Sequence, residues 1–282
     1  MRLIRSTSQL VSFVERLRAQ GRRIGLVPTM GALHEGHVSL IRRAAHENDV
    51  VIVTIFVNPL QFGPREDFAR YPRTLKPDLH LAQAAGADVI FAPSVRDIYP
   101  PGFEPHVEPG VLAERWEGKR RPGHFRGVAT VVAILFDLTR PTHAYFGRKD
   151  YQQALIVQRV VREWRLPLTV HILPTVREPD GLAMSSRNAY LTAAQRKQAV
   201  VLSQAFSAAR AEIRAGERRA APLIARMRRI IQHAPDARVD YAAIADAQTL
   251  KPVHRLRGRV VILLAAWIGR TRLIDNLLVD VS

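Results

Sequence analysis

Short apolar segments alternate with amphipathic segments over the first 175 residues, and this alternation is the strongest constraint on the fold. The apolar segments have the length and continuity of strands buried in a parallel sheet. They cover residues 22–29, 49–58, 88–93, 143–147 and 166–175. Segments with helical periodicity follow at 36–49, 74–87, 127–141 and 150–164. This order predicts an α/β fold with a Rossmann-like, doubly wound parallel sheet and right-handed crossovers.

The pattern changes near Glu178, where a polar segment rich in turn residues follows the last of these strands. Thr192 and Gln195 then form a T-x-x-Q capping box, which predicts the start of a long helix. A second helix and three strands follow, at 221–234, 237–247, 258–269 and 271–280. Helices followed by strands predict a smaller α+β domain at 178–282, separate from a first domain at 1–177.

Composition excludes several classes of protein. The 282 residues include no cysteine, so disulfides and thiolate metal sites are excluded. The N-terminal segment lacks the apolar core of a secretory signal, and no apolar run reaches the roughly 18–20 residues of a membrane span. We therefore expect a cytoplasmic protein with no membrane partner. The formal charge of +17 favours anionic ligands. Because the arginines are spread along the chain, a generally basic surface is favoured over a specific nucleic-acid platform.

Polar segments follow the predicted strands at the edge where parallel α/β sheets bind ligands. They read PTMGALHEGH, NPLQFG, PSVRDIYPPG, GRKDYQQ and TVREPDGLAMSSRN. Four of these five combine glycine, amide, hydroxyl, histidine or basic side chains directly after an apolar strand. The segregation predicts one composite polar site at this edge.

The histidine pair in GALHEGH has three interpretations. His34 and His37 lie three apart, whereas a zinc-protease pair needs H-E-x-x-H and a third ligand, so zinc is disfavoured. Gly31 and Gly36 permit close backbone approach, and a helix that begins near Gly36 offers free N–H groups to a phosphate. Alternatively, both histidines only cap that helix.

Two further segments carry candidate phosphate ligands. After Gly147, Lys149 can reach a phosphate and Asp150 can cap the next helix, although a strand–helix turn with a solvated lysine is equally consistent. The MSSR segment at 184–187 supplies two hydroxyls and a guanidinium, or is an ordinary flexible loop.

Amide side chains accompany these segments. Asn58, Gln61 and Gln153 can hold hydroxyl and carboxylate groups of a small substrate. For Gln152 we predict a solvent-facing position on the helix that follows GRKD.

Six segments together resemble the pantoate–β-alanine ligase family of the HIGH-type nucleotidyltransferases. They are PTMGALHEGH, FVNPLQFGPREDFARYPRT, RPGHFRGVATVV, YFGRKDYQQ, REPDGLAMSSRNAYL and TRLIDN, and they span nearly the whole chain in the family's order. The resemblance implies a two-step ligation that requires ATP and Mg²⁺. Pantoate would be adenylated with release of pyrophosphate, and β-alanine would then displace AMP to give pantothenate, a coenzyme A precursor.

The resemblance also implies the site residues. Those that would bind ATP are Met30, Gly31, Ala32, Leu33, His34, Glu35, Gly36, His37, Gly147, Arg148, Lys149, Asp150, Val176, Met184, Ser185, Ser186 and Arg187. Among these, the catalytic set would be His34, His37, Lys149, Ser185, Ser186 and Arg187, with His37 the family's proposed proton donor. Glu35 and Arg148 receive no role of their own.

For the other ligands, the resemblance implies that Gln61 would bind pantoate and β-alanine and that Gln153 would bind pantoate. Asn58 would support substrate binding. Asp78 is a candidate for the magnesium side of the site, with a solvated acid at a helix start as the alternative.

Domain motion and assembly complete the expectations. By resemblance, residues 178–282 would form a lid that moves about a hinge near 178–188, and the enzyme would be a homodimer. A cytidylyltransferase would share the H-x-G-H element, but it would not be expected to carry NPLQF, YFGRKDYQQ and TRLIDN together. A non-enzymatic, basic nucleic-acid-binding protein is the remaining alternative.

Overall fold

The computed structural model describes residues 1–64 and 66–281, and the chain divides into two compact units. The first unit comprises Met1–Arg148 and Gln152–Pro174, and the second comprises Lys149–Tyr151 and the chain from Thr175 onward. The three residues Lys149–Tyr151 therefore belong by their contacts to the second unit, although they lie in sequence within the first.

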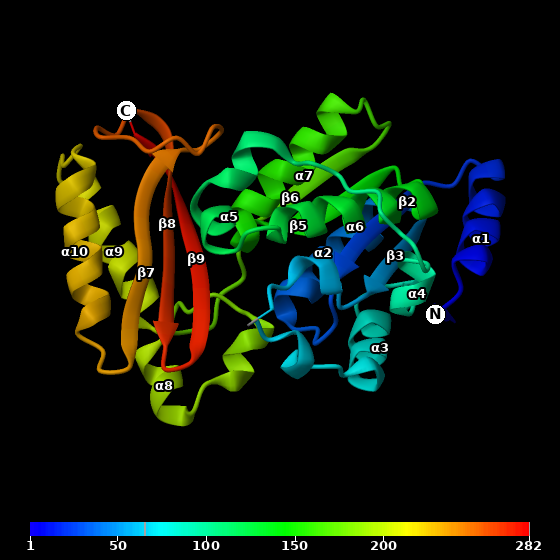
Figure 1. The fold of residues 1–282 in the computed structure, drawn as a ribbon, viewed down its shortest axis with the longest axis horizontal. Helices are drawn as coiled ribbons and strands as arrows, with labels where there is room; N and C mark the ends of the chain where they lie inside the picture. Colours follow the sequence, from blue (N-terminus) through cyan, green and yellow to red (C-terminus); the bar gives the residue numbers. More distant parts are fainter. Residues whose placement is uncertain (65, 282) are drawn as a thin grey trace. The chain divides into compact units, whose positions relative to one another are not determined.

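A six-stranded parallel sheet forms the centre of the first unit, in the order β1-β4-β3-β2-β5-β6. Its strands are β1 (Arg2–Ile4), β2 (Ile24–Thr29), β3 (Val50–Ile55), β4 (Val89–Phe91), β5 (His143–Gly147) and β6 (Thr169–Leu173). Strands β2, β3, β5 and β6 are labelled in Figure 1. The predicted parallel, doubly wound sheet is confirmed. The first strand, β1, was not predicted, because three residues are too few to show a periodicity. Strand order reverses between β2 and β5, so the connections after these two neighbours lead away in opposite directions.

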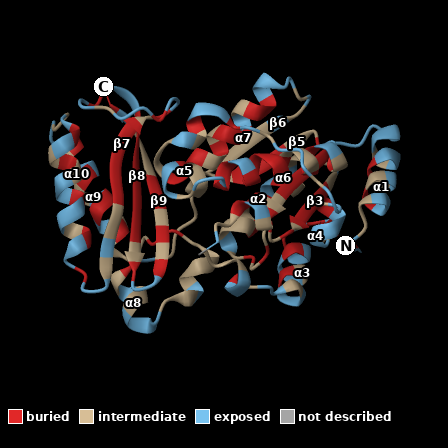
Figure 2. Ribbon diagram, viewed as in Figure 1, coloured by how far each residue is buried: buried red, intermediate tan, exposed pale blue. Residues whose placement is uncertain are grey.

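Helices cover both faces of this sheet. Those of the first unit are α1 (Thr7–Ala19), α2 (Glu35–Glu47), α3 (Leu75–Ala84), α4 (Val95–Ile98), α5 (Trp116–Arg120), α6 (His124–Thr139) and most of α7 (Tyr151–Glu163). Leu26 of β2 packs in one core with α1, α6 and α7, whereas the next residue, Val27, packs in another core with α2 and α3. Successive strand residues point to opposite faces, which gives the three layers. Helix α6 is buried along most of its length, as Figure 2 shows.

The second unit packs two helices on an antiparallel sheet with the order β7-β8-β9. Its elements are α8 (Ala193–Gln198), α9 (Val201–Arg214), α10 (Ala220–Gln232), β7 (Ala237–Asp246), β8 (Gly258–Ile268) and β9 (Thr271–Val281). The capping box at Thr192 and Gln195 is confirmed. The single long helix predicted after it was wrong, because a tighter turn with a bond from Leu202 N to Ala199 O (3.2 Å) separates α8 from α9.

Short 3₁₀ helices complete the described structure. They are η1 (Pro59–Gln61), η2 (Phe68–Arg70), η3 (Gly110–Glu114), η4 (Arg148–Asp150) and η5 (Ser186–Tyr190). Across residues 1–64 and 66–281, none of the helices has the length and apolarity that crossing a membrane requires.

Helix α6 approaches η1 closely at Gly127. A Cβ added there would lie 2.2 Å from the Leu60 carbonyl oxygen and 2.7 Å from the Gln61 backbone nitrogen. Both atoms belong to the main chain and cannot rotate away, so only glycine fits.

We therefore expect Gly127→Ala to lower the free energy of unfolding by about 2 kcal/mol, the usual effect of overpacking. Urea unfolding followed by circular dichroism measures it. The matched control is Gly147→Ala, whose added Cβ meets no atom within 4 Å. Equal midpoints for the two variants would contradict the close approach.

Candidate active site

The loop after β2 is held by one buried carboxylate. Asp78, in the first turn of α3, is 1% exposed. Its Oδ2 accepts from Ala32 N (3.0 Å), its Oδ1 accepts from Leu33 N (2.8 Å), and Thr74 Oγ1 donates to both oxygens (3.2 Å). The turn needs a left-handed backbone at Gly31 (φ +80°) and Ala32 (φ +49°), and Asp78 satisfies the N–H groups that this turn exposes. The alternative of a solvated acid at position 78 is therefore wrong.

The two histidines form a capping box at the start of α2. His34 Nδ1 accepts from Gly36 N (3.1 Å), and His37 Nδ1 accepts from His34 N (3.3 Å). The ring centroids are 4.2 Å apart. With Nδ1 of each ring accepting, the proton of each neutral imidazole lies on Nε2, which is then a donor. Capping and anion binding are thus compatible, because they use different nitrogens.

Gly36 is required by this arrangement. A Cβ at position 36 would lie 2.8 Å from His34 Cε1, so any side chain would displace the ring. Within the residues that the structure describes, no group of three histidine or acidic side chains is arranged to hold a metal ion. The H-x-G-H element is therefore built as the capped start of α2.

The amides of the NPLQF segment form a buried cluster. Gln61 Oε1 accepts from Asn58 Nδ2 (3.1 Å), and Gln61 Nε2 lies 3.0 Å from Met30 Sδ in the β2 loop. Asn58 Nδ2 also donates to Gly127 O (3.0 Å), and Tyr99 Oη donates to Asn58 Oδ1 (2.8 Å). The Gln61 amide therefore has a fixed orientation beside the loop that carries the histidines.

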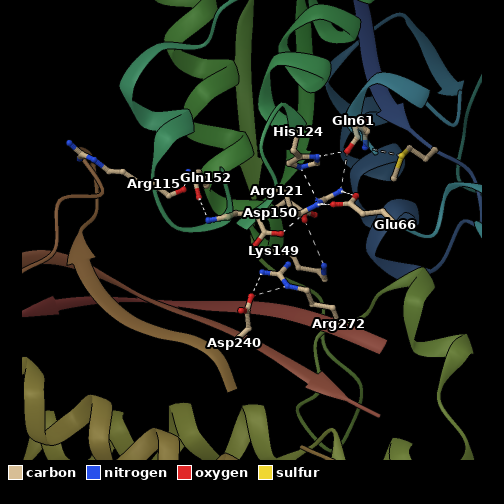
Figure 3. A network of polar contacts seen from close by, with 12 residues as sticks. Gln61, Glu66, Arg115, Arg121, His124, Lys149, Asp150, Gln152, Asp240 and Arg272 are labelled. Atoms are coloured by element: carbon tan, nitrogen blue, oxygen red, sulfur yellow. Dashed lines mark hydrogen bonds and ion pairs between the residues drawn. The ribbon is translucent and has the colours of Figure 1, made fainter. Parts of the chain in front are cut away.

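An ion pair and a histidine hold the main chain of Gln61 in place (Figure 3). The Gln61 carbonyl accepts from Arg121 Nη2 (3.1 Å) and from His124 Nδ1 (2.8 Å). Arg121 also forms a two-pronged pair with Glu66, at 2.8 and 2.6 Å. Burial acts to raise the pKa of Glu66, but Arg121 holds that pKa below its usual value. Burial, with Arg121 second, lowers the pKa of His124 to about 4, so His124 is neutral at pH 7.

Gly147 and Arg148 end β5 and begin η4 in the first unit, whereas the predicted residues of the second unit lie in two segments, 149–150 and 176–187. Lys149 Nζ is 3.8 Å from Asp150 Oδ1, and the Lys149 carbonyl accepts from Asn276 Nδ2 (2.8 Å). Ser185 caps η5 by accepting from Arg187 N (3.3 Å). The carbonyl of Val176, another predicted ATP-binding residue, accepts from Met184 N (3.0 Å).

Comparison with known proteins decides the family. The family model described as pantoate-beta-alanine ligase matches residues 2–278. The chain belongs to the pantoate–β-alanine ligase family.

The relatives agree over the whole chain. The pantothenate synthetase of Moorella thermoacetica is 52% identical over 282 residues and covers 100% of both chains. The crystal structure of pantothenate synthetase from Thermus thermophilus has a TM-score of 0.92 and 46% identity, covering 98% of this chain and 99% of that one. The pantoate-β-alanine ligase from Francisella tularensis, solved in complex with β-γ ATP and β-alanine, has a TM-score of 0.81 and 38% identity, covering 99% and 97%. This member of the ligase family is therefore an enzyme.

The position predicted for Gln152 was wrong. Gln152 is 5% exposed, and its Nε2 donates to Leu112 O (2.6 Å) and Arg115 O (2.8 Å), while its Oε1 accepts from Glu117 N (3.1 Å). These bonds fix the segment before α6, so Gln152 is structural. Gln153, the neighbouring residue, is half-buried.

Arg121 and His124, which hold the main chain of Gln61, were not among the residues predicted from the sequence. Arg121 lies in the basic run GKRRPGHFRG, and the spread of arginines along the chain favoured a generally basic surface. Its side chain is only 13% exposed, because Glu66 from a distant segment neutralises it. The RPGHF motif itself was the available signal.

Asp78→Asn tests the clamp on the β2 loop in this ligase family member. The new amide would keep an acceptor for one of the two backbone donors, Ala32 N and Leu33 N, and would place an N–H group against the other, so we expect a loss of about 2 kcal/mol in the free energy of unfolding. Asp88→Asn is the control, since Asp88 is exposed and its carboxylate accepts from the backbone N–H of Val51 (2.8 Å). If Asp78→Asn lowers the free energy of unfolding no more than Asp88→Asn does, Asp78 does not hold the β2 loop.

His124 predicts a pH dependence of stability. Its pKa is about 4 when folded, against an ordinary value of 6.5, so between these values the unfolded chain binds more protons. Its contribution is present above pH 6.5 and is lost as pH falls toward 4.

We expect His124→Asn, which retains a donor near the Nδ1 position, to remove on the order of 2 kcal/mol of the stability change between about pH 7 and about pH 4.5. Urea unfolding of both proteins at the two pH values measures this. Parallel pH profiles would contradict a neutral, buried His124.

Proposed function

We propose that this enzyme condenses (R)-pantoate with β-alanine, using ATP, through a pantoyl-adenylate intermediate, to make the coenzyme A precursor pantothenate. The observation that carries the proposal is the family match over residues 2–278. The relative solved with β-γ ATP and β-alanine supports two of the three substrates. The first unit supports it chemically, because a helix start, two imidazole donors and a fixed amide meet beside the sheet's switch point.

In the first step, a pantoate carboxylate oxygen attacks the α-phosphorus of ATP. The bond from that phosphorus to the bridging oxygen breaks, and pyrophosphate leaves. In the second step, the β-alanine amine attacks the acyl carbon, loses a proton and expels AMP. Neither step needs a protein nucleophile, so catalysis rests on positioning and on stabilising charge that develops on phosphate oxygens.

The residues divide by chemistry. His34 and His37, through Nε2–H, and the N-terminus of α2 would bind phosphate oxygens, with His37 as proton donor. Gln61 would orient pantoate and β-alanine, since its amide is fixed by Asn58 and its carbonyl by Arg121.

Residues of the other segments complete the proposed set. Lys149, Ser185, Ser186 and Arg187 would add charge and donors for the phosphates. Gln153 would bind pantoate. Glu35, by contrast, forms an exposed ion pair with Arg42 on the surface of α2, which supports leaving it without a role.

Magnesium would bind at this site together with the phosphates of the nucleotide. Mg²⁺ is commonly held by one or two carboxylates together with substrate phosphates and water. Asp78, the predicted magnesium-side residue, already accepts from two backbone N–H groups and a hydroxyl, so its main role is to hold the loop. Asp150 is half-exposed, and its Oδ1 lies 3.8 Å from Lys149 Nζ. The bound ion would neutralise phosphate charge.

We further propose a cytoplasmic homodimer whose second unit acts as a lid with a hinge near 178–188. A lid would keep water from the reactive acyl adenylate. Sedimentation of the purified protein at close to twice 31.7 kDa is expected. Sedimentation as a monomer at micromolar concentration would contradict the dimer.

The function is tested by omission. Each of ATP, Mg²⁺, pantoate and β-alanine is left out in turn, and AMP should form only when all four are supplied. In a single turnover, pyrophosphate release should need pantoate but not β-alanine. We expect Arg187→Ala to lower the rate of pantoate-dependent pyrophosphate release by about 100-fold, since a charged donor to the phosphates is lost. The fold should be unchanged by circular dichroism.

One result would contradict the role of Arg187, and two would contradict the proposed reaction. An unchanged rate in Arg187→Ala would remove Arg187 from the site. Accumulation of a stable nucleotide ester with no response to β-alanine would indicate a nucleotidyltransferase of another kind. Salt-sensitive duplex binding without ATP turnover would indicate a nucleic-acid-binding protein.

A further inference from the structure

Two adjacent residues of β9, Asp275 and Asn276, hold the two segments of the second unit that carry the proposed phosphate ligands. Asn276 contacts Lys149 directly, and Asp275 contacts the turn that leads into the MSSR segment. Asn276 is 4% exposed, and its Nδ2 donates to the Lys149 carbonyl (2.8 Å), 127 residues away in sequence. Tyr151 Oη donates to the Ala247 carbonyl (2.7 Å) and fixes the same segment a second time. These bonds explain why Lys149–Tyr151 belongs to the second unit rather than to the unit of the strand that precedes it.

Asp275 holds the other segment. It is 4% exposed and forms a two-pronged ion pair with Arg177, at 2.6 and 3.0 Å. Arg177 Nη1 also donates to Gly181 O (3.0 Å), across the turn that ends at Ala183, the backbone partner of Arg177. This turn leads directly into the MSSR segment at 184–187.

The two residues are also tied to each other, since Asp275 Oδ1 accepts from Asn276 N (2.7 Å). Burial raises the pKa of Asp275, although its ion pair with Arg177 acts to lower that pKa. A rigid antiparallel strand thus presents an amide to one segment and a carboxylate to the other.

We propose that Asp275 and Asn276 are positioning residues for the nucleotide chemistry: they fix Lys149 and the MSSR segment to one strand, so that these phosphate ligands act as a single preorganised set. The inference rests on the proposed function of that site. It also gives a role to the TRLIDN motif, for which no function followed from the sequence. Neither residue needs to touch substrate.

Asn276 is the better residue to vary, because loss of Asp275 would leave Arg177 without its buried partner and endanger folding. Asn276→Ala removes the donor and Asn276→Leu removes it while keeping the side-chain volume. The matched control is Gln198→Ala, another amide that bridges two segments of the second unit: its Nε2 donates to Asp236 Oδ2 (3.0 Å), and its Oε1 accepts from Asp236 N (2.8 Å).

The experiment is a double-mutant cycle between Asn276 and Lys149 in the full-length enzyme. Two quantities are measured: the Kd of ATP by calorimetry, and kcat/KM for ATP in pantoate-dependent pyrophosphate release. We expect both Asn276 variants to weaken ATP binding and to lower kcat/KM about tenfold, as for a lost hydrogen bond that orients a charged ligand. In the Lys149→Ala background the same change should have less than about a twofold effect, because the group being positioned is absent.

Three outcomes decide the inference. If the Asn276 variants lower ATP binding and kcat/KM by the same factor with Lys149 present and with Lys149→Ala, the inference is overturned, since the effect would then be a general structural one. Asn276 variants that match Gln198→Ala in both measurements would overturn it as well. If wild-type enzyme binds ATP but releases no pyrophosphate with pantoate, the proposed function fails, while the ATP-binding cycle still tests the positioning.

Discussion

The reversal of strand order between β2 and β5 is the constraint on which the first unit depends. Both strands are parallel and hydrogen-bonded, yet β2 continues to β3 on one side and β5 continues to β6 on the other. The connections that follow them must therefore diverge at the carboxyl edge, where parallel sheets leave a crevice for ligands. The loop with His34 and His37 follows β2, and Gly147 ends β5, so the placement of these polar segments follows from the topology.

Preorganisation in this unit comes from buried groups that never need to meet substrate. Asp78 satisfies the N–H groups of the β2 loop, and Arg121 with His124 fixes the carbonyl of Gln61. Such networks are destabilising unless every member is paired, and here the charge of Arg121 is matched by Glu66. The side chains that remain for chemistry are thereby held in one orientation, which suits a reaction catalysed by positioning and charge stabilisation.

Local patterns predicted much of this molecule from sequence. Five of the six parallel strands and the capping box at Thr192 follow from periodicity and capping rules. Long-range pairing could not be predicted. Arg121 looked like surface charge because its partner Glu66 lies 55 residues away, and Gln152 looked solvent-facing because its three backbone partners precede it by 35 to 40 residues. The anchoring of Lys149 by Asn276 is of the same kind, since only the fold brings a residue of the last strand to that turn.

The central claim is that ATP activates the pantoate carboxylate at its α-phosphate. The most direct test is whether an oxygen atom is transferred from pantoate to AMP. Pantoate labelled with ¹⁸O in its carboxylate is incubated with ATP, Mg²⁺, β-alanine and the enzyme, and the AMP formed is examined by mass spectrometry. Attack on the α-phosphorus followed by acyl transfer predicts one ¹⁸O atom in each AMP. AMP without label, or ADP as the nucleotide product, would contradict the account.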